Sequence, residues 1–344
     1  MTQRSQKNIV CFGELLLRYS PYMNGAFIRD AQMPVYIGGA ELNVASALAQ
    51  WQQPVSYVTA LPNHYLANEI VDYVKSNNIK TQHIHYAGER IGAYYLPQGA
   101  DLKNNAVIYD RNYSSFAQLQ PGDIDWHTVL KDAHWFHFSA ISPALNATAA
   151  AVCLEAVQVA SSLGITISVD LNYRAKLWQY GETPVSVMQP LLKYCDVIMG
   201  NIWAAEKLAG IALPSNFDAT STDEHIFLQT SQTSAQQLQQ QYPTCKIVAN
   251  TFRFDDGAGI KYYAAYHTGA TMAHTQTFKV PHIVDKIGSG DCFMAGLIYG
   301  IDQQLPPQQI IDTAATAAIL KLQQLGDATS STLADIKNAL PIYE

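Results

Sequence analysis

Short β-forming runs alternate with helical stretches along most of this chain, and this alternation constrains the fold more than any other sequence feature. Gly, Pro, polar residues or helix-forming segments bound each run. The predicted strands are Ile9–Phe12, Val55–Thr59, Trp135–Ser139, Ile165–Asp170, Asp196–Met199 and Lys246–Asn250. The predicted helices, with apolar residues at three- and four-residue spacing, are Glu41–Trp51, Leu66–Ser76, Ala144–Leu163, Val185–Leu192, Ser234–Gln241, Ser289–Tyr299 and Gln308–Gln323. The alternation predicts a parallel sheet with helices on both faces.

Two stretches depart from this pattern. Val35–Ile37, Ile91–Tyr95 and Ala106–Tyr109 resemble strands joined by Gly, Asn and Pro turns, with no helix between the last two. They predict a small antiparallel sheet that acts as a lid over a ligand or as a dimer contact. The Ser/Thr/Gln-rich segment Leu213–Gln240 is predicted to be a surface loop leading into a polar helix.

Composition narrows the range of partners. Of the 344 residues 48% are hydrophobic and 14% charged, which is typical of a globular protein. With a net charge of -7 and no Lys/Arg run, the chain lacks the basic footprint of a nucleic-acid-binding protein, and placed cations must meet any anionic substrate. No stretch approaches the roughly 18 apolar residues of a membrane span, and no export signal is evident. Five dispersed cysteines indicate reduced core thiols, so we expect a cytoplasmic protein.

The segment Val284–Gly296 is the most informative about chemistry. Gly288 and Gly290 flank Ser289 directly before a helical pattern, so the backbone N–H groups there can converge on an anion beside the positive end of the helix dipole. A carboxylate at Asp291 would repel a bound anion. The presence of this carboxylate is explained if the carboxylate takes a proton from a hydroxyl that attacks a phosphoryl group. The alternative is an ordinary loop that ends in a capping Asp.

A second Gly-rich junction lies near the N-terminus. Gly38 and Gly39 precede another helical pattern, and Asn43 lies one turn inside it. The glycines let a ligand approach the backbone closely, and the Asn43 amide can donate and accept hydrogen bonds with sugar hydroxyls. By itself this junction is more typical of a helix start with a polar first turn.

Together the two junctions resemble the paired signatures of the ribokinase-like (PfkB) carbohydrate kinases, G-G-x-x-x-N-x-A and, far downstream, D-[TK]-x-G-x-G-D-x-F. The resemblance covers nearly the whole chain. It implies a ribokinase-like α/β fold of three αβα layers with a mainly parallel central sheet and a small β lid. It also implies one kinase domain over residues 1–344, with lid strands within about 14–37 and 91–111. Asp291 would be the catalytic base, beside Gly288, Ser289 and Gly290.

Several local stretches resemble the 2-keto-3-deoxygluconate kinases of that family. They are Gly13–Pro21, Gly38–Glu41, Gly92–Tyr95, Tyr109–Arg111 and Asp170–Trp178. A sugar acid carries a carboxylate that placed cations must bind. The resemblance therefore implies Arg111 and Arg174 as carboxylate anchors, with Gly38, Gly39, Asn43, Tyr94 and Tyr109 also binding the substrate, and Arg18 nearby.

Each of these side chains has a plainer interpretation. Arg111 could be a solvated charge at the end of a lid strand, and Arg174 a structural partner of Asp170. Tyr94 and Tyr109 could simply pack in a small sheet. Tyr109 and Arg111 lie two residues apart on one strand face, however, so both can point into one cleft.

For the nucleotide, the resemblance implies ATP and Mg²⁺, and it allows a monovalent cation. Asn201, Thr251 and Arg253 would contact ATP together with Gly288 and Gly290, and residues 312–323 with Gly326 and Asp327 would form the adenine wall. One departure stands out, because Ala204 replaces the Glu of the family's Asn-x-x-Glu. Asp170 or water could then complete the Mg²⁺ shell.

The sequence thus predicts a kinase that phosphorylates the terminal hydroxyl of 2-keto-3-deoxygluconate. Two alternatives stay open: a kinase for another small sugar such as fructose, and a sugar or nucleotide sensor without turnover. The resemblance also implies a homodimer formed through the lid strands.

Overall fold

The computed structural model describes residues 8–21, 32–98, 107–215, 217–221, 223–269 and 271–342. Its central sheet contains β1 (Asn8–Phe12), β4 (Val55–Val58), β9 (Ala133–Ser139), β10 (Thr166–Asp170), β11 (Val197–Met199), β12 (Ile247–Asp256), β13 (Gly259–His267), β14 (Met272–His274) and β15 (Phe278–Val280). The strand order is β14-β13-β12-β11-β10-β9-β1-β4, and β15 pairs with β13. The strands from β4 to β12 in this order run parallel, and β13 to β15 form an antiparallel extension.

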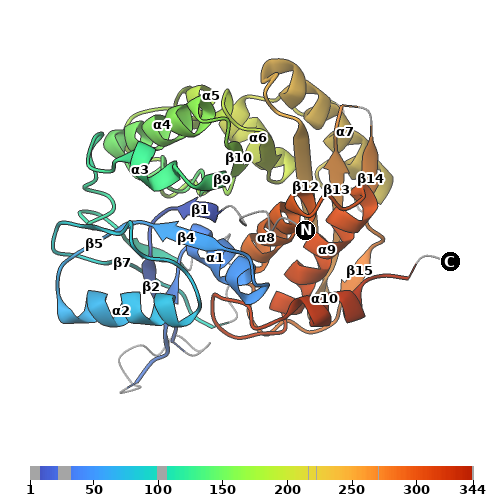
Figure 1. Cartoon of the computed structure of the whole chain (residues 1–344). Helices are drawn as coiled ribbons and strands as arrows, with labels where there is room; N and C mark the ends of the chain where they lie inside the picture. The colour runs from blue at the N-terminus through green and yellow to red at the C-terminus, as the bar shows by residue number, and fades with distance from the viewer. Residues whose placement is uncertain are drawn as a thin grey trace, which may run out of the picture.

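Helices cover both faces of this sheet (Figure 1). One layer contains α1 (Ala40–Gln50), α2 (Tyr65–Ser76), α8 (Ser289–Asp302), α9 (Pro307–Lys321) and α10 (Leu333–Ala339). The other contains α3 (Trp126–Leu130), α4 (Ala147–Ser162), α5 (Pro184–Leu192), α6 (Ile202–Ala209) and α7 (Glu224–Gln241). Because both faces are covered, β1, β4 and β11 are almost wholly apolar and buried.

A second sheet projects from the first, at the β2 and β7 labels of Figure 1. It consists of β2 (Leu16–Tyr19), β3 (Val35–Gly38), β7 (Gly92–Tyr95) and β8 (Ile108–Asp110), in the order β3-β2-β7-β8. The expectation of a purely antiparallel sheet is wrong at one pairing, because β2 and β7 run parallel. Ala106, predicted to start the last strand, lies outside the described residues. A short parallel pair, β5 (Ala60–Leu61) and β6 (His85–Tyr86), lies apart from this lid sheet.

The predicted loop leading into a polar helix is present in the described residues of Leu213–Gln240, but the helix begins at Glu224 rather than at the predicted Ser234. Helix α7 begins at Glu224, where the Asp223 carboxylate accepts a hydrogen bond from His225 N at 2.9 Å. Its first turns are stabilised by burial of Phe227 and Leu228, which lie in a largely polar stretch. Asn216 and Thr222 of the predicted loop lie outside the described residues.

Capping explains a smaller difference. The helix predicted from Ala144 begins three residues later, because the Asn146 side chain accepts a hydrogen bond from Ala149 N at 2.8 Å and caps α4. The three-layer αβα arrangement with a mainly parallel sheet and a small β lid is confirmed. All five cysteines are buried and unpaired. Among the described helices, none is long and apolar enough to cross a membrane.

Candidate active site

A pocket of about 490 Å³ lies between the carboxyl ends of the parallel strands and the lid sheet. Parallel α/β proteins bind ligands at this edge. The predicted site residues that line it are Gly39, Asn43, Tyr94, Tyr109, Arg111, Asp170, Arg174, Asn201, Thr251, Arg253, Gly288, Ser289, Gly290 and Asp291. Gly38 is not among the lining residues. It packs against Asp327 instead, where an added Cβ would lie 2.1 Å from Oδ2.

Helix α8 presents its N-terminus to the pocket. Gly288 caps the helix with a φ of 79°, a left-handed conformation that favours glycine. The first bond within the helix runs from Cys292 N to Gly288 O at 2.8 Å, so the N–H groups of residues 289–291 have no partner within the helix. The Ser289 hydroxyl donates to Lys286 O at 3.1 Å and braces the loop. This turn can therefore bind an anion through its backbone.

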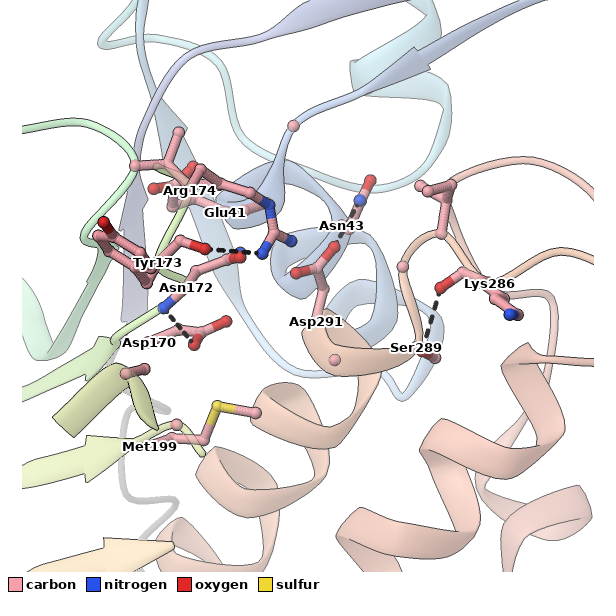
Figure 2. Close-up of a pocket in the computed structure, with 18 of the residues that line it drawn as sticks. Glu41, Asn43, Asp170, Asn172, Tyr173, Arg174, Met199, Lys286, Ser289 and Asp291 are labelled. Atoms are coloured by element: carbon pink, nitrogen blue, oxygen red, sulfur yellow. Dashed lines mark hydrogen bonds between the residues drawn. The ribbon is translucent and has the colours of Figure 1, made fainter. Parts of the chain in front are cut away.

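Asp291 lies in this same turn and is buried. Its Oδ2 accepts a hydrogen bond from Asn43 Nδ2 at 2.7 Å, which joins the two Gly-rich junctions (Figure 2). Burial raises the pKa of Asp291 to about 8. The Asn43 hydrogen bond opposes the rise, as does the charge of Arg174, whereas the charges of Asp170 and Glu41 add to it. Such a carboxyl group can accept a proton near neutral pH.

Two further buried carboxyl groups line the pocket. Asp170 ends β10, and its Oδ1 accepts a hydrogen bond from Asn172 N at 3.0 Å. Burial raises its pKa to about 6. Glu41, in the first turn of α1, accepts hydrogen bonds from Ser139 N at 2.9 Å and Ser139 Oγ at 2.5 Å. Burial raises the Glu41 pKa to about 7. The pocket thus combines a backbone anion site with several carboxyl groups whose pKa is raised by burial, among them Asp291, Asp170 and Glu41.

Arg174 follows β10 and brings a cation to this acidic site. Its Nη1 donates to Tyr173 O at 3.1 Å, and Figure 2 shows the guanidinium directed toward Asp291. Within the described residues Arg174 forms no ion pair with Asp170, although its charge lowers the pKa of that carboxyl group. The interpretation of Arg174 as the structural ion-pair partner of Asp170 is therefore wrong.

Arg111 follows β8 directly and is buried, so its interpretation as a solvated charge is also wrong. Its Nε donates to Glu14 Oε2 at 2.5 Å, and the Ser114 hydroxyl donates to Glu14 Oε1. This buried ion pair fixes the guanidinium at the pocket wall. Glu14 was not predicted as a site residue, although it stands in the Gly13–Pro21 stretch.

Tyr94 and Tyr109 are cross-strand partners on β7 and β8, with ring centroids 6.5 Å apart. Both line the pocket. The Tyr94 hydroxyl donates to Asp327 Oδ2 at 2.9 Å. Arg18, expected nearby, is instead buried behind the pocket wall and paired with Asp285 and Asp327. Unlike Arg111, Arg18 is not among the lining residues, so it is not placed to contact a ligand in the pocket.

Asn201, Thr251 and Arg253, which are predicted to bind the nucleotide, also line the pocket. Asn201 caps α6, because its Oδ1 accepts from Ala204 N at 2.8 Å, so the amide nitrogen is the group that it presents. Ala204 lines the pocket, and Glu206 pairs with its neighbour Lys207 at 3.2 Å. Arg253 on β12 lies opposite Tyr262 on β13.

The predicted adenine wall is only partly seen. Asp327 lines the pocket, but no described residue of α9 does. Lining residues that the sequence did not single out include Glu14, Glu41, Asn172 and Lys286. Glu41 and Lys286 stand inside the two motifs themselves, which is the signal that could have identified them.

Comparison with known proteins decides the family. Residues 6–334 match the profile of the pfkB family carbohydrate kinases. The chain belongs to the PfkB family. It is therefore a sugar kinase.

The similar PfkB proteins include sugar-acid and neutral-sugar kinases. A solved 2-dehydro-3-deoxygluconokinase from Thermotoga maritima is 32% identical, with a TM-score of 0.87 and coverage of 96% of this chain and 98% of that one. A 2-dehydro-3-deoxygalactonokinase from Haloferax volcanii is 27% identical over 96% of each chain. A fructokinase-2 from Solanum lycopersicum is 25% identical over 97% of this chain and 93% of its own.

Proposed function

We propose that this PfkB protein is an ATP-dependent kinase that phosphorylates the terminal hydroxyl of 2-keto-3-deoxygluconate, giving 2-keto-3-deoxy-6-phosphogluconate. One observation carries the proposal: Arg174 and Arg111 line the same pocket as Asp291 and the α8 N-terminus. A neutral sugar offers no charge to a guanidinium group, whereas a carboxylate forms charge-assisted hydrogen bonds with it. The similar kinases from T. maritima and H. volcanii are named for 2-dehydro-3-deoxy sugar acids, which supports this substrate class.

Asp291 acts as the base. It takes the proton of the sugar hydroxyl while that oxygen bonds to the γ-phosphorus and the bond from phosphorus to the ADP oxygen breaks. The N–H groups of residues 288–291 stabilise the charge on the transferring phosphoryl group. Gly39, Asn43, Tyr94 and Tyr109 hold the sugar, and Arg111 and Arg174 hold its carboxylate.

Asn201, Thr251, Arg253, Gly288 and Gly290 would bind ATP. Within the described residues, no group of three or more His, Cys, Asp or Glu side chains forms a metal cage. Mg²⁺ fits this pocket nonetheless, because it binds through nucleotide phosphates, retained waters and one carboxylate, which Asp170 can supply. Bound there, Mg²⁺ would neutralise phosphate charge. We assign no protein ligands to a monovalent cation.

We further propose that residues 1–344 act as one kinase domain that forms a homodimer through the lid. A cross-strand row of Val35, Tyr19, Tyr95 and Ile108 crosses one lid face, and its two end residues are exposed. Such a row would be buried by a second copy. Five buried free thiols favour a reducing compartment such as the cytoplasm. No partner other than the sugar acid, ATP and a second copy is proposed.

ATP consumption across a sugar panel tests this function. The panel should contain 2-keto-3-deoxygluconate, 2-keto-3-deoxygalactonate, fructose and ribose. We expect turnover with a sugar acid. Turnover with fructose but with no sugar acid would favour the fructokinase-like alternative, which is supported by the similarity to the S. lycopersicum fructokinase. Binding of a sugar without ATP consumption would indicate a sensor.

A further inference from the structure

A group of buried charged and polar side chains reaches from the pocket wall, where Tyr94 and Asp327 line the pocket, to residues behind it. We call it the Arg18 cluster, and it comprises Arg18, Asp285, Asp327, Lys321 and Tyr94. Arg18 and Tyr94 come from lid strands β2 and β7, whereas Asp285 precedes the α8 loop and Lys321 ends α9. Lys321 is 0% exposed and Arg18 1%. The cluster therefore joins the lid to the phosphate-binding side inside the protein.

The charges of this cluster balance. Arg18 Nη2 lies 2.7 Å from Asp285 Oδ2, and Arg18 Nε lies 2.9 Å from Asp327 Oδ1 at an angle unsuited to a hydrogen bond. Arg18 also stacks on the Tyr36 ring, with its Cζ 4.4 Å from the ring centroid. The Lys321 ammonium donates to Gln324 O at 3.1 Å and supplies the second positive charge.

Asp327 is the hub of the cluster. Its carboxylate accepts the Tyr94 hydroxyl at 2.9 Å on the sugar side. The same carboxylate fills the space beside Gly38, and its backbone carbonyl fills the space beside Gly288, the cap of α8. Asp285 fixes the loop from the other direction, because Oδ1 accepts from Ile287 N at 3.0 Å and Oδ2 from Gly326 N at 3.2 Å.

Stability alone is a weak reason for such a cluster. Burying charges costs several kcal/mol each, and well-packed apolar residues of similar volume usually stabilise a core as well or better. What apolar packing cannot supply is directional bonds from one aspartate, Asp285, both to Arg18 of the lid and to Ile287 of the loop. A shift of either side by a fraction of an ångström would break these contacts.

We infer that the Arg18 cluster is a set of positioning residues that transmits the state of the phosphate-binding loop to the sugar-binding lid. The inference rests on the proposed sites for the sugar and ATP. A nucleotide bound at the loop favours the loop position in which Asp327 holds the lid tyrosine, so each ligand tightens the binding of the other.

Calorimetry of sugar binding with and without a non-hydrolysable ATP analogue and Mg²⁺ tests this inference. The sugar used is whichever one the turnover panel identifies, so failure of the sugar-acid assignment leaves this test intact. We expect the analogue to lower the wild-type sugar Kd about tenfold or more, within the usual range of coupling between sites. In Arg18→Lys and in Tyr94→Phe, that ratio should fall to about threefold or less, because the contact to Asp285 or to Asp327 is lost or weakened.

Arg90→Lys is the matched control. Arg90 pairs with Asp110 on the same lid at 2.6 Å, but both side chains are more than 40% exposed and neither lines the pocket. This variant should keep the wild-type ratio. Tyr94→Phe removes one oxygen only, so it remains informative if Arg18→Lys fails to fold. The inference would be overturned if the analogue left the sugar Kd of the wild-type protein almost unchanged. It would also be overturned if Tyr94→Phe or folded Arg18→Lys kept the wild-type ratio of the two Kd values, even if those variants melted at a lower temperature.

Discussion

The two halves of the pocket are built in different ways. The proposed phosphate side is one turn of one helix, residues 288–291, and under the proposed function it would act mainly through backbone N–H groups. The sugar side collects side chains from β7, from the end of β8, from the loop after β10 and from α1. Reaction type thus depends on a local backbone shape, whereas the choice of acceptor depends on side chains that tertiary structure brings together.

The two sides of the pocket also differ in whether their positive charge needs a buried counter-charge. Helix dipole and N–H groups on the phosphate side need no counter-charge. On the sugar side the Arg111 guanidinium is held by buried Glu14, and Arg174 lies near the acidic group around Asp291. Changes on the phosphate side should therefore affect turnover with any sugar. Changes on the sugar side should affect which sugar is chosen.

The largest effect is expected from Asp291→Asn. Loss of the base should lower kcat by about 10²–10⁴-fold, the usual contribution of proton transfer by a placed group. Steady-state assays with each sugar measure it, and Asp302→Asn at the far end of α8 is the control. Near-wild-type kcat in folded Asp291→Asn would show that another group accepts the proton.

Arg174→Gln should come next, because it removes a charge-assisted bond of about 1.5–3 kcal/mol from the substrate carboxylate. We expect kcat/KM for 2-keto-3-deoxygluconate to fall about 10- to 100-fold, with little change for fructose. Arg111→Gln should show the same selectivity loss together with a lower melting temperature, since Glu14 would remain buried without its cation. Equal losses for both sugars would place Arg174 outside carboxylate recognition.

Gly288→Ala should destabilise the fold by about 1–3 kcal/mol, because alanine is strained at this φ of 79° and its Cβ would meet Asp327 O. Gly290→Ala is the matched control, since nothing lies within 4 Å of its added Cβ. Thermal unfolding measures both. Equal melting temperatures for the two variants would contradict the described loop.

The smallest effect concerns pH. Asp291 must be ionised to accept a proton and its pKa is about 8, so kcat/KM should rise with pH and level off above about 8. The Arg174 charge lowers this pKa, so Arg174→Gln should move the rising limb to higher pH. The apparent pKa of this rising limb reports the coupled titration of Asp291, Asp170 and Glu41. A limb that moved to lower pH would contradict the arrangement in Figure 2.

Stability should follow the opposite trend for this group. Because the folded pKa of Asp291 lies above its ordinary value of 3.8, the folded protein binds more protons than the unfolded chain between about pH 4 and 8. The contribution of Asp291 to stability therefore declines as pH rises through that window. Asp291→Asn should flatten this part of the curve in thermal unfolding.

The sequence predicted those features that depend on local pattern. The buried parallel strands and the Gly-rich start of α8 follow from short-range periodicity and from the backbone that glycine permits. Both junctions line one pocket, and the Asn43 to Asp291 hydrogen bond links them directly. Strand β13, which reads GIKYYAAYH, was not predicted, because it forms an antiparallel hairpin with β12 and so lies outside the alternation of strands and helices.

Features that depend on distant partners could not be predicted. Arg18 was expected only to lie near the substrate, and its pairing with Asp285 and Asp327 was not foreseen because these residues lie far along the chain. Glu14 could not be identified as a site residue from the sequence, because its partner Arg111 lies 97 residues away. The start of helix α7 was misplaced for a similar reason, since burial of apolar residues such as Phe227 and Leu228 outweighs the polar composition of the segment.

A competition assay tests the central claim most directly. Equal low concentrations of 2-keto-3-deoxygluconate and fructose are mixed with limiting enzyme and ATP, and phosphorus NMR quantifies the two phosphorylated products, whose ratio gives the ratio of kcat/KM. We predict that 2-keto-3-deoxy-6-phosphogluconate predominates by about tenfold or more, the value of one charge-assisted bond. Equal products, or an excess of fructose phosphate, would contradict the assignment of Arg111 and Arg174 as carboxylate anchors.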